Sequence, residues 1–255
     1  MISYTTFLQP KTNQWVTFVH GAGGSSAIWY KQIKSFNADF NVLLVDLRGH
    51  GNSKKGIDTV KYTFNQIAND IIDVLDSLHI QQSHFVGISL GSIIVRVIAA
   101  NYPNRVGKII MAGAIMKLNI RSQLLMWLGN SLKSIIPFLL LYKFFAYIIM
   151  PRKNHKKSRS MFINEAKKLD QNEFIRWFQL TAEVNELLKH FRKIPSSIPF
   201  LYFMGDQDAM FLPSIKKLVA KHSLNSSLII VPNCGHVVNI DQPEFFNVKS
   251  IYYLQ

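Results

Sequence analysis

A serine at position 89 lies between two glycines in the segment Gly87-Ile-Ser-Leu-Gly91. Apolar runs on both sides of this segment predict a buried strand, a tight turn and a buried helix. A Gly-x-Ser-x-Gly turn between a strand and a helix is typical of a nucleophile elbow, which presents the serine hydroxyl at the end of the strand. Ser89 is therefore the candidate nucleophile, and the glycines are needed because neighbouring backbone crowds their positions.

A serine hydroxyl is a weak nucleophile unless a neighbouring base accepts its proton. The chain supplies His236 within the segment 233–246, and Asp206 and Asp208 within the segment 203–211. Both segments follow apolar runs of strand length, so we expect them at strand ends. The chain order serine, aspartate, histidine is the one that enzymes with this elbow use.

The elements that must position these residues follow an alternating pattern of apolar strand-length runs and segments of helical spacing. This alternation predicts an α/β fold with a parallel sheet covered by helices on both faces. The predicted strands are 2–9 at an edge, 15–20, 41–46, 84–89, 106–114, 199–206 and 227–233. The predicted helices are 26–36, 63–78, 92–102, 214–222 and 243–254.

Residues 117–195 interrupt the alternation, because they contain no clear strand and have the pattern of several helices. We expect an insertion on the sheet rather than a separate domain. The predicted organisation is a core formed by residues 1–116 and 196–255, with a helical cap or lid formed by residues 117–195.

The composition describes a folded chain of 255 residues, with 48% apolar and 17% charged residues. Lys and Arg number 29 against 15 Asp and Glu, and the net charge of +14 favours an anionic membrane surface or an acidic substrate as partner. Nucleic acid is not expected, because the sequence has no zinc-ligand spacing, RNA-binding signature or obvious recognition helix.

The insertion contains an apolar run, 134–150, whose 17 residues fall short of a membrane span of about 20 and include Pro137 and Lys143. One interpretation is a buried helix pair, and the other is an interfacial segment or a cover for an apolar substrate. The basic stretch 151–159 is either a solvated loop or a contact for anionic lipid head groups. The second interpretation of each segment predicts peripheral contact with an anionic membrane through residues 134–159.

Cys234 is the only cysteine, so an intramolecular disulfide is impossible and a reducing compartment is favoured. The first ten residues lack the charged and long apolar regions of a secretory signal. We therefore expect a cytoplasmic protein. If residues 134–159 contact a membrane, we expect that contact to be peripheral and at the inner face. The oligomeric state stays open.

The sequence resembles the α/β-hydrolase superfamily in five motifs that occur in the family's order: HGAGGS (20–25), DLRGHGNS (46–53), GISLGS (87–92), GDQD (205–208) and GHVVNIDQPEFF (235–246). The resemblance covers roughly residues 15–116 and 196–254. It implies the α/β-hydrolase fold, a mostly parallel central sheet flanked by helices, with the insertion at the place where members carry their cap.

The resemblance also implies the roles of the site residues. Ser89 is the nucleophile, His236 the base, and Asp208 the acid that holds the imidazole, with Asp206 as the alternative. No metal and no organic cofactor are required by this chemistry.

Members of the superfamily stabilise the oxyanion with two backbone N–H groups, which here correspond to Leu90 and Ala22, with Gly23 as the alternative to Ala22. Gly21 and Gly23 are expected to let the main chain approach the substrate closely.

Other polar residues of the motifs are expected to support the site. Asp46 and Arg48 brace the loop behind it, His20 and His50 belong to its framework, and Cys234 is a small buried residue.

The predicted activity is that of a serine hydrolase, an esterase or lipase that cleaves a carboxylic ester with an apolar acyl group through an acyl-enzyme. The aliphatic and aromatic side chains of the insertion favour this substrate, and Trp127 is expected to contact it. The same triad also serves thioesterases, C–C bond hydrolases, peptidases, cofactor-free haloperoxidases and a lyase of menaquinone synthesis, and the fold does not decide among them. A non-enzymatic binding protein would have a broken triad, whereas this sequence contains all three residues.

Overall fold

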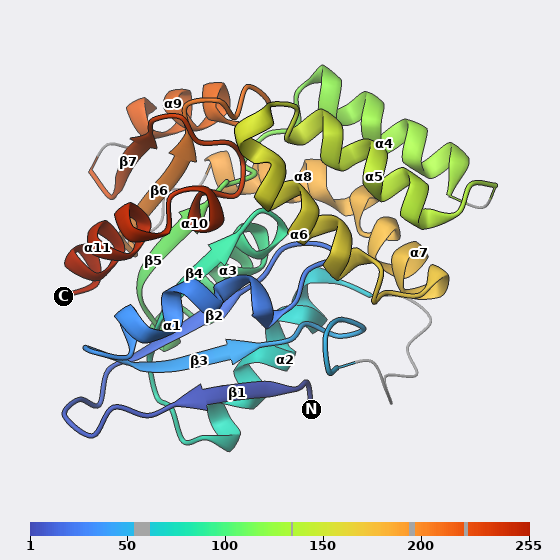
Figure 1. The fold of residues 1–255 in the computed structure, drawn as a ribbon. Coiled ribbons are helices and arrows are strands. Elements are labelled where there is room, and N and C mark those ends of the chain that lie inside the picture. Colours follow the sequence, from blue (N-terminus) through green and yellow to red (C-terminus); the bar gives the residue numbers. More distant parts are fainter. Residues whose placement is uncertain (54–61, 134, 194–196, 222–223) are drawn as a thin grey trace.

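The computed structural model describes residues 1–53, 62–133, 135–193, 197–221 and 224–255. Its strands form one seven-stranded sheet in the order β1-β3-β2-β4-β5-β6-β7 (Figure 1). The edge strand β1 is antiparallel to β3, and every other pair of neighbours is parallel. The strands are β1 (Tyr4–Phe7), β2 (Trp15–Val19), β3 (Asn41–Val45), β4 (Ser83–Ile88), β5 (Val106–Ala112), β6 (Phe200–Gly205) and β7 (Ser226–Val231).

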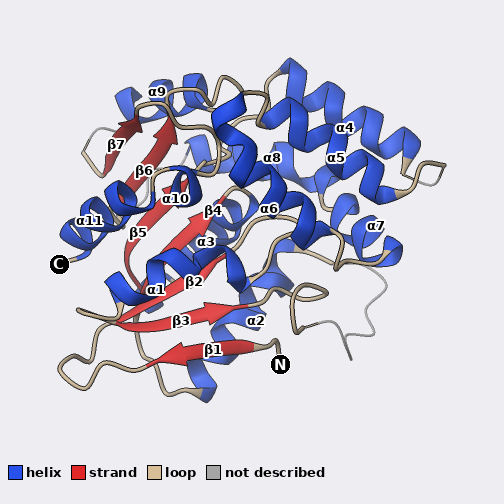
Figure 2. Cartoon of the chain, in the orientation of Figure 1, coloured by secondary structure: helices blue, strands red, loops and turns tan. Residues whose placement is uncertain are grey.

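Helices cover both faces of the sheet, which explains why the central strands are continuous apolar runs (Figure 2). In β3, Leu43 and Val45 pack into the core on one face, whereas Val42 and Leu44 pack into the core on the other. The first face carries α2 (Phe64–Ser77), α3 (Leu90–Asn101) and α9 (Leu212–Lys221). The second carries the 3-10 turn η1 (Ser26–Trp29), α1 (Tyr30–Phe36), α10 (Val238–Asp241) and α11 (Pro243–Leu254).

Local sequence signals set the bounds of these helices. Thr63 accepts a hydrogen bond from the N–H of Gln66, and the Gln66 side chain accepts one from the N–H of Thr63, so a complete capping box starts α2. Pro243 occupies the first turn of α11, where its missing N–H costs nothing.

Every regular element that the structure describes in the connection from β5 to β6 is a helix. The connection comprises α4 (Ile120–Leu132), α5 (Phe138–Ile149), η3 (Lys153–His155), α6 (Lys156–Ala166), α7 (Gln171–Gln179) and α8 (Thr181–Lys193). Figure 1 shows these helices gathered at the end of the sheet toward which the parallel strands point. None of the described helices is long and apolar enough to cross a membrane.

Most differences between the predicted and observed elements concern their ends. The predicted helix 26–36 is a 3-10 turn followed by an α-helix, and the predicted helix 92–102 starts two residues earlier, at Leu90. The 3-10 turn η2 (Pro103–Arg105) precedes β5. Residue 222 of the predicted helix 214–222, residue 134 of the apolar run and residues 195–196 at the predicted cap boundary lie outside the described residues.

Candidate active site

Ser89 occupies a strained turn between β4 and α3, with a φ of 54° and a ψ of −119°. A positive φ is costly for a residue with a Cβ atom and persists where the surroundings enforce it. The surroundings here are backbone: a Cβ added to Gly87 would lie 2.5 Å from the carbonyl oxygen of Gly91, and one added to Gly91 would lie 2.3 Å from that of Val19. Both positions therefore require glycine, as the sequence predicts for a nucleophile elbow.

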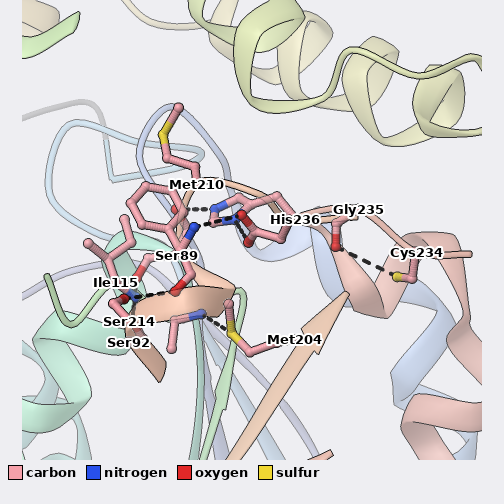
Figure 3. Close-up of polar contacts among 12 residues, drawn as sticks. Ser89, Ser92, Ile115, Met204, Met210, Ser214, Cys234, Gly235 and His236 are labelled. Carbon is pink, nitrogen blue, oxygen red and sulfur yellow. Dashed lines mark hydrogen bonds and ion pairs between the residues drawn. The ribbon is translucent and has the colours of Figure 1, made fainter. Parts of the chain in front are cut away.

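The structure brings Ser89, His236 and Asp208 together in one hydrogen-bonded chain, of which Figure 3 labels Ser89 and His236. The Oγ atom of Ser89 lies 3.0 Å from Nε2 of His236, and Nδ1 of His236 lies 2.7 Å from Oδ2 of Asp208. Ser89 follows β4, Asp208 follows β6 and His236 follows β7, so parallel strands deliver all three to the same edge of the sheet. This arrangement can transfer the serine proton to the imidazole.

The two aspartates that the sequence left as rivals have different partners. The carboxylate of Asp208 is 1% exposed and also accepts a hydrogen bond of 3.1 Å from the N–H of Phe211. The carboxylate of Asp206 accepts a hydrogen bond of 3.1 Å from the N–H of Cys234. Asp206 therefore ties the loop after β6 to the loop after β7, and Asp208 orients the histidine.

The insertion supports the loop that carries His236. Asp241 accepts a hydrogen bond of 3.0 Å from the N–H of Gly235, and the hydroxyl of Ser158 in α6 donates to the same carboxylate. His155 of η3 contacts Gln207 in the loop after β6, with 2.8 Å between Nε2 and Oε1. The contacts made by His155 and Ser158 join residues that are 52 and 83 positions apart, so no local sequence pattern indicates them.

Two buried histidines hold the loops around the oxyanion site. Nε2 of His50 accepts a hydrogen bond of 3.0 Å from the N–H of Gly23, and Nε2 of His20 accepts one of 3.0 Å from the N–H of Leu47. An imidazole nitrogen that accepts a hydrogen bond carries no proton, so these rings are neutral. Burial accordingly lowers the pKa of His20. His20 and His50, which the sequence predicts as framework residues, therefore hold these loops by accepting hydrogen bonds from the main chain.

These contacts distinguish the candidate oxyanion donors. The N–H of Gly23 is already bonded to His50, so Gly23 is the weaker alternative to Ala22. Among the described residues, no hydrogen-bond acceptor is found for the N–H groups of Ala22 and Leu90, and both residues line the cavity beside Ser89. The N–H groups of Ala22 and Leu90 therefore stay the candidate oxyanion donors.

Asp46 and Arg48 brace the loop after β3, as the sequence predicts. Asp46 accepts hydrogen bonds from the N–H groups of Ser26 at 2.7 Å and Asn52 at 2.9 Å. The guanidinium of Arg48 forms a two-point contact with Asp70, at 2.6 and 2.7 Å, over the ring of Tyr62.

A cavity of about 260 Å³ opens beside Ser89 and His236. Its described lining is mainly aliphatic and aromatic, and it includes no lysine or arginine. Gly21, Ala22 and Leu90 also line it. The other apolar lining residues include Ile93, Ile115, Leu125, Met126, Phe145, Ile149, Met161, Phe174, Trp177, Phe178 and Met210.

Two residues predicted to contact the substrate lie outside the lining of this cavity. Trp127 is 64% exposed and lies outside the cavity lining, whereas its neighbours Leu125 and Met126 line the cavity. Each helical residue is rotated about 100° from the previous one, so Trp127 points away from the cavity. Gly23 is also outside the lining, because the side chain of Tyr142 covers it.

Tyr142 is a functional candidate that the sequence analysis missed. Its hydroxyl lies 2.5 Å from the position that a Cβ of Gly23 would occupy, next to the candidate oxyanion loop. Burial raises the pKa of this hydroxyl, so it stays protonated and can donate a hydrogen bond into the cavity. The carboxylate of Glu165 also lines the cavity. It accepts a hydrogen bond of 2.6 Å from Ser25 and pairs with Lys168 at 2.6 Å.

No group of three or more His, Cys, Asp or Glu residues within the described part of the chain could hold a metal ion. Cys234 is buried, and burial raises the pKa of its thiol.

The chain is similar in sequence and in fold to known hydrolases. Residues 14–133 match the family described as alpha/beta hydrolase fold. The chain is 27% identical over 254 residues to 3-oxoadipate enol-lactonase 2 of Acinetobacter baylyi, covering 96% of this chain and 90% of the relative. It is 24% identical to a putative carbamate hydrolase, RutD, of Agrobacterium fabrum, covering 92% and 90%. The fold is similar to the crystal structure of the enol-lactonase from Burkholderia xenovorans, with a TM-score of 0.81, 18% identity, and coverage of 99% and 96%.

Proposed function

Because this chain belongs to the α/β-hydrolase superfamily, we propose that it is a serine hydrolase that cleaves a neutral carboxylic ester with an apolar acyl group. The observation that carries this proposal is the hydrogen-bonded chain from Ser89 through His236 to Asp208. Such a chain, together with two free N–H groups, is sufficient for ester hydrolysis.

The reaction starts when His236 accepts the proton of Ser89 as its Oγ atom attacks the acyl carbonyl. The carbonyl oxygen becomes negative and accepts hydrogen bonds from the N–H groups of Ala22 and Leu90. His236, now charged and stabilised by Asp208, donates its proton to the leaving alcohol. Water then loses a proton to His236 and attacks the acyl carbonyl. His236 returns this proton to Oγ of Ser89 as the acyl–oxygen bond breaks and the acid leaves.

The cavity lining supports an uncharged, apolar acyl group. A carboxylate on the substrate would lose its hydration without gaining a cation, because the described lining has no lysine or arginine. Its volume of about 260 Å³ lies below the ~300–1,000 Å³ common for small-molecule sites, which favours a short or medium-length acyl group.

Helices α4 to α8 supply many of the side chains of the cavity wall, including Met126, Phe145, Phe174 and Val184. We therefore propose that residues 117–195 act as the cap that selects the substrate. Replacing these wall residues would change the preferred acyl length, while the triad would keep its reactivity toward a short ester.

A lactone, which is a cyclic ester, is the second candidate substrate. Two proteins similar to this chain are enol-lactonases. The same acyl-enzyme forms from a lactone, but the leaving alkoxide stays attached to the acyl group, so the cavity must hold both parts. Thioesters, amides and C–C bonds remain alternatives to either ester.

The test combines a covalent probe with a substrate panel. A fluorophosphonate should label Ser89 in the wild-type protein and should not label Ser89→Ala. Initial rates on p-nitrophenyl esters with acyl chains of two to sixteen carbons, on uncharged lactones and on matched thioesters then rank the substrate classes. Absence of labelling in a folded wild-type protein would refute a serine hydrolase, and labelling without turnover of any ester or lactone would refute ester hydrolysis.

A further inference from the structure

The outer face of α4 is apolar although it is exposed. Ile120, Leu124 and Trp127 follow the spacing i, i+4, i+7 of one helix face, and they are 85%, 59% and 64% exposed. A surface helix normally presents polar residues to solvent and apolar ones to the core. Here Leu125 and Met126 already line the cavity, so apolar residues occupy both sides of α4.

The neighbouring helix α5 repeats this arrangement. Leu140, Phe144 and Tyr147 have the same spacing on its exposed side, whereas Phe145 and Ile149 line the cavity. The two helices meet where Phe145 of α5 packs against Gly129 of α4, and Figure 1 shows them at one end of the molecule. The exposed residues of both helices form what we call the outer face of α4 and α5.

The charge around this face has a single sign. Residues 117–159 contain nine Lys or Arg and no Asp or Glu. Lys143 lies on the exposed side of α5, between Leu140 and Tyr147. The guanidinium of Arg159 lies 4.4 Å from the centre of the Tyr147 ring.

Arg159 also connects the basic segment 152–159 to the end of α5. Its guanidinium donates hydrogen bonds to the carbonyl oxygens of Met150 and of Arg152, the latter at 3.2 Å. Arg152, Lys153 and Lys156 are exposed beside this contact. The apolar outer face of α4 and α5 is thus bordered by positive charge.

We propose that the outer face of α4 and α5 docks on the surface of an anionic lipid bilayer. The aliphatic and aromatic side chains would enter the boundary between head groups and acyl chains, where Trp and Tyr are favoured, and the basic side chains would contact lipid phosphates. A second copy of the chain is a poorer partner, because its equivalent face carries the same positive charge. This binding does not depend on ester hydrolysis.

The apolar part of the proposal is tested by sedimentation of the protein with phosphatidylcholine vesicles that contain or lack phosphatidylglycerol. The wild type should bind the phosphatidylglycerol vesicles. The double variant Leu124→Ser/Trp127→Ser should bind them at least tenfold more weakly. The matched control is Val248→Ser/Tyr252→Ser on α11, where the native side chains are also exposed, and it should bind like the wild type.

The electrostatic part is tested with Arg152→Gln/Lys153→Gln. Each basic residue near an anionic surface is worth roughly a fivefold change in affinity, so this variant should bind about twenty-five times more weakly. The control Lys216→Gln/Lys217→Gln on α9 should bind like the wild type. Added salt should weaken vesicle binding by the wild type and by this control. All variants should hydrolyse a short soluble ester at the wild-type rate, which shows that they are folded.

Three results would overturn the proposal. One is wild-type protein that does not bind phosphatidylglycerol vesicles, and another is equal binding by the outer-face variants and their controls. The third is a wild-type dimer in analytical ultracentrifugation that Trp127→Ser dissociates, which would assign this face to contact between copies. A failure of fluorophosphonate labelling would affect the proposed reaction and not this binding.

Discussion

The imidazole of His236 lies 2.7 Å from the carboxylate of Asp208, while Asp206, two residues earlier, bonds the main chain at Cys234. The two aspartates lie in the same turn and have the same side chain, yet only Asp208 contacts the histidine. This difference makes the proposed mechanism testable at two neighbouring positions.

We expect Asp208→Asn to lower kcat for a p-nitrophenyl ester by about 10⁴-fold, because the amide favours the wrong imidazole tautomer and cannot stabilise its charged form. The control Asp206→Asn keeps an oxygen that accepts from Cys234, so its kcat should fall less than tenfold. Steady-state kinetics of both variants checks this, and equal losses would contradict the assignment of Asp208.

We expect Ser89→Gly to be more stable than Ser89→Ala, by about 1 kcal/mol, because glycine adopts the positive φ at this position without strain. Both variants should be inactive toward esters. Urea unfolding of the two proteins measures the difference. A glycine variant that is no more stable than the alanine variant would show that the elbow holds no strain.

We expect Tyr142→Phe to lower kcat/KM for esters by about tenfold, which corresponds to one lost hydrogen bond of ~1 to 1.5 kcal/mol. The hydroxyl borders the oxyanion loop and lines the cavity beside Ser89, where a bound substrate can accept its hydrogen bond. Phe145→Leu, which changes the wall without removing a donor, is the control. An unchanged kcat/KM in Tyr142→Phe would remove this hydroxyl from substrate binding.

The stability of the fold should decrease as the pH falls below 6.5. Burial lowers the pKa of His84 from 6.5 to about 4, and Nδ1 of this residue accepts a hydrogen bond from the N–H of Lys108. Between these two pH values the unfolded chain binds a proton that the folded chain does not, so acid favours unfolding. The contribution of His84 is complete above pH 6.5 and is lost by about pH 4; His20 acts in the same direction.

Thermal unfolding between pH 7 and pH 4 measures this dependence. His84→Asn keeps an acceptor for the N–H of Lys108 but cannot be protonated in this range, so its melting temperature should fall less steeply than that of the wild type. The same slope in both proteins would show that other groups control the acid sensitivity.

The sequence by itself determined the α/β fold class, the order of strands and helices, and the residue types at the elbow. These are local properties: apolar periodicity reports which faces are buried, and a turn with a positive φ between two crowded backbones admits few residue types. The pairing of Ser89 with His236 was predictable for a related reason, since parallel strands bring their carboxyl ends to one edge of the sheet.

The tertiary structure alone decided which neighbours point where. It separated Asp208 from Asp206, bonded the N–H of Gly23 to His50, and placed Trp127 outside the cavity lining and Tyr142 within it. The physical reason is that these outcomes depend on side-chain direction and on contacts between distant segments. A rotation of one residue along α4, or one hydrogen bond between loops 27 residues apart, changes them without changing any local pattern in the sequence.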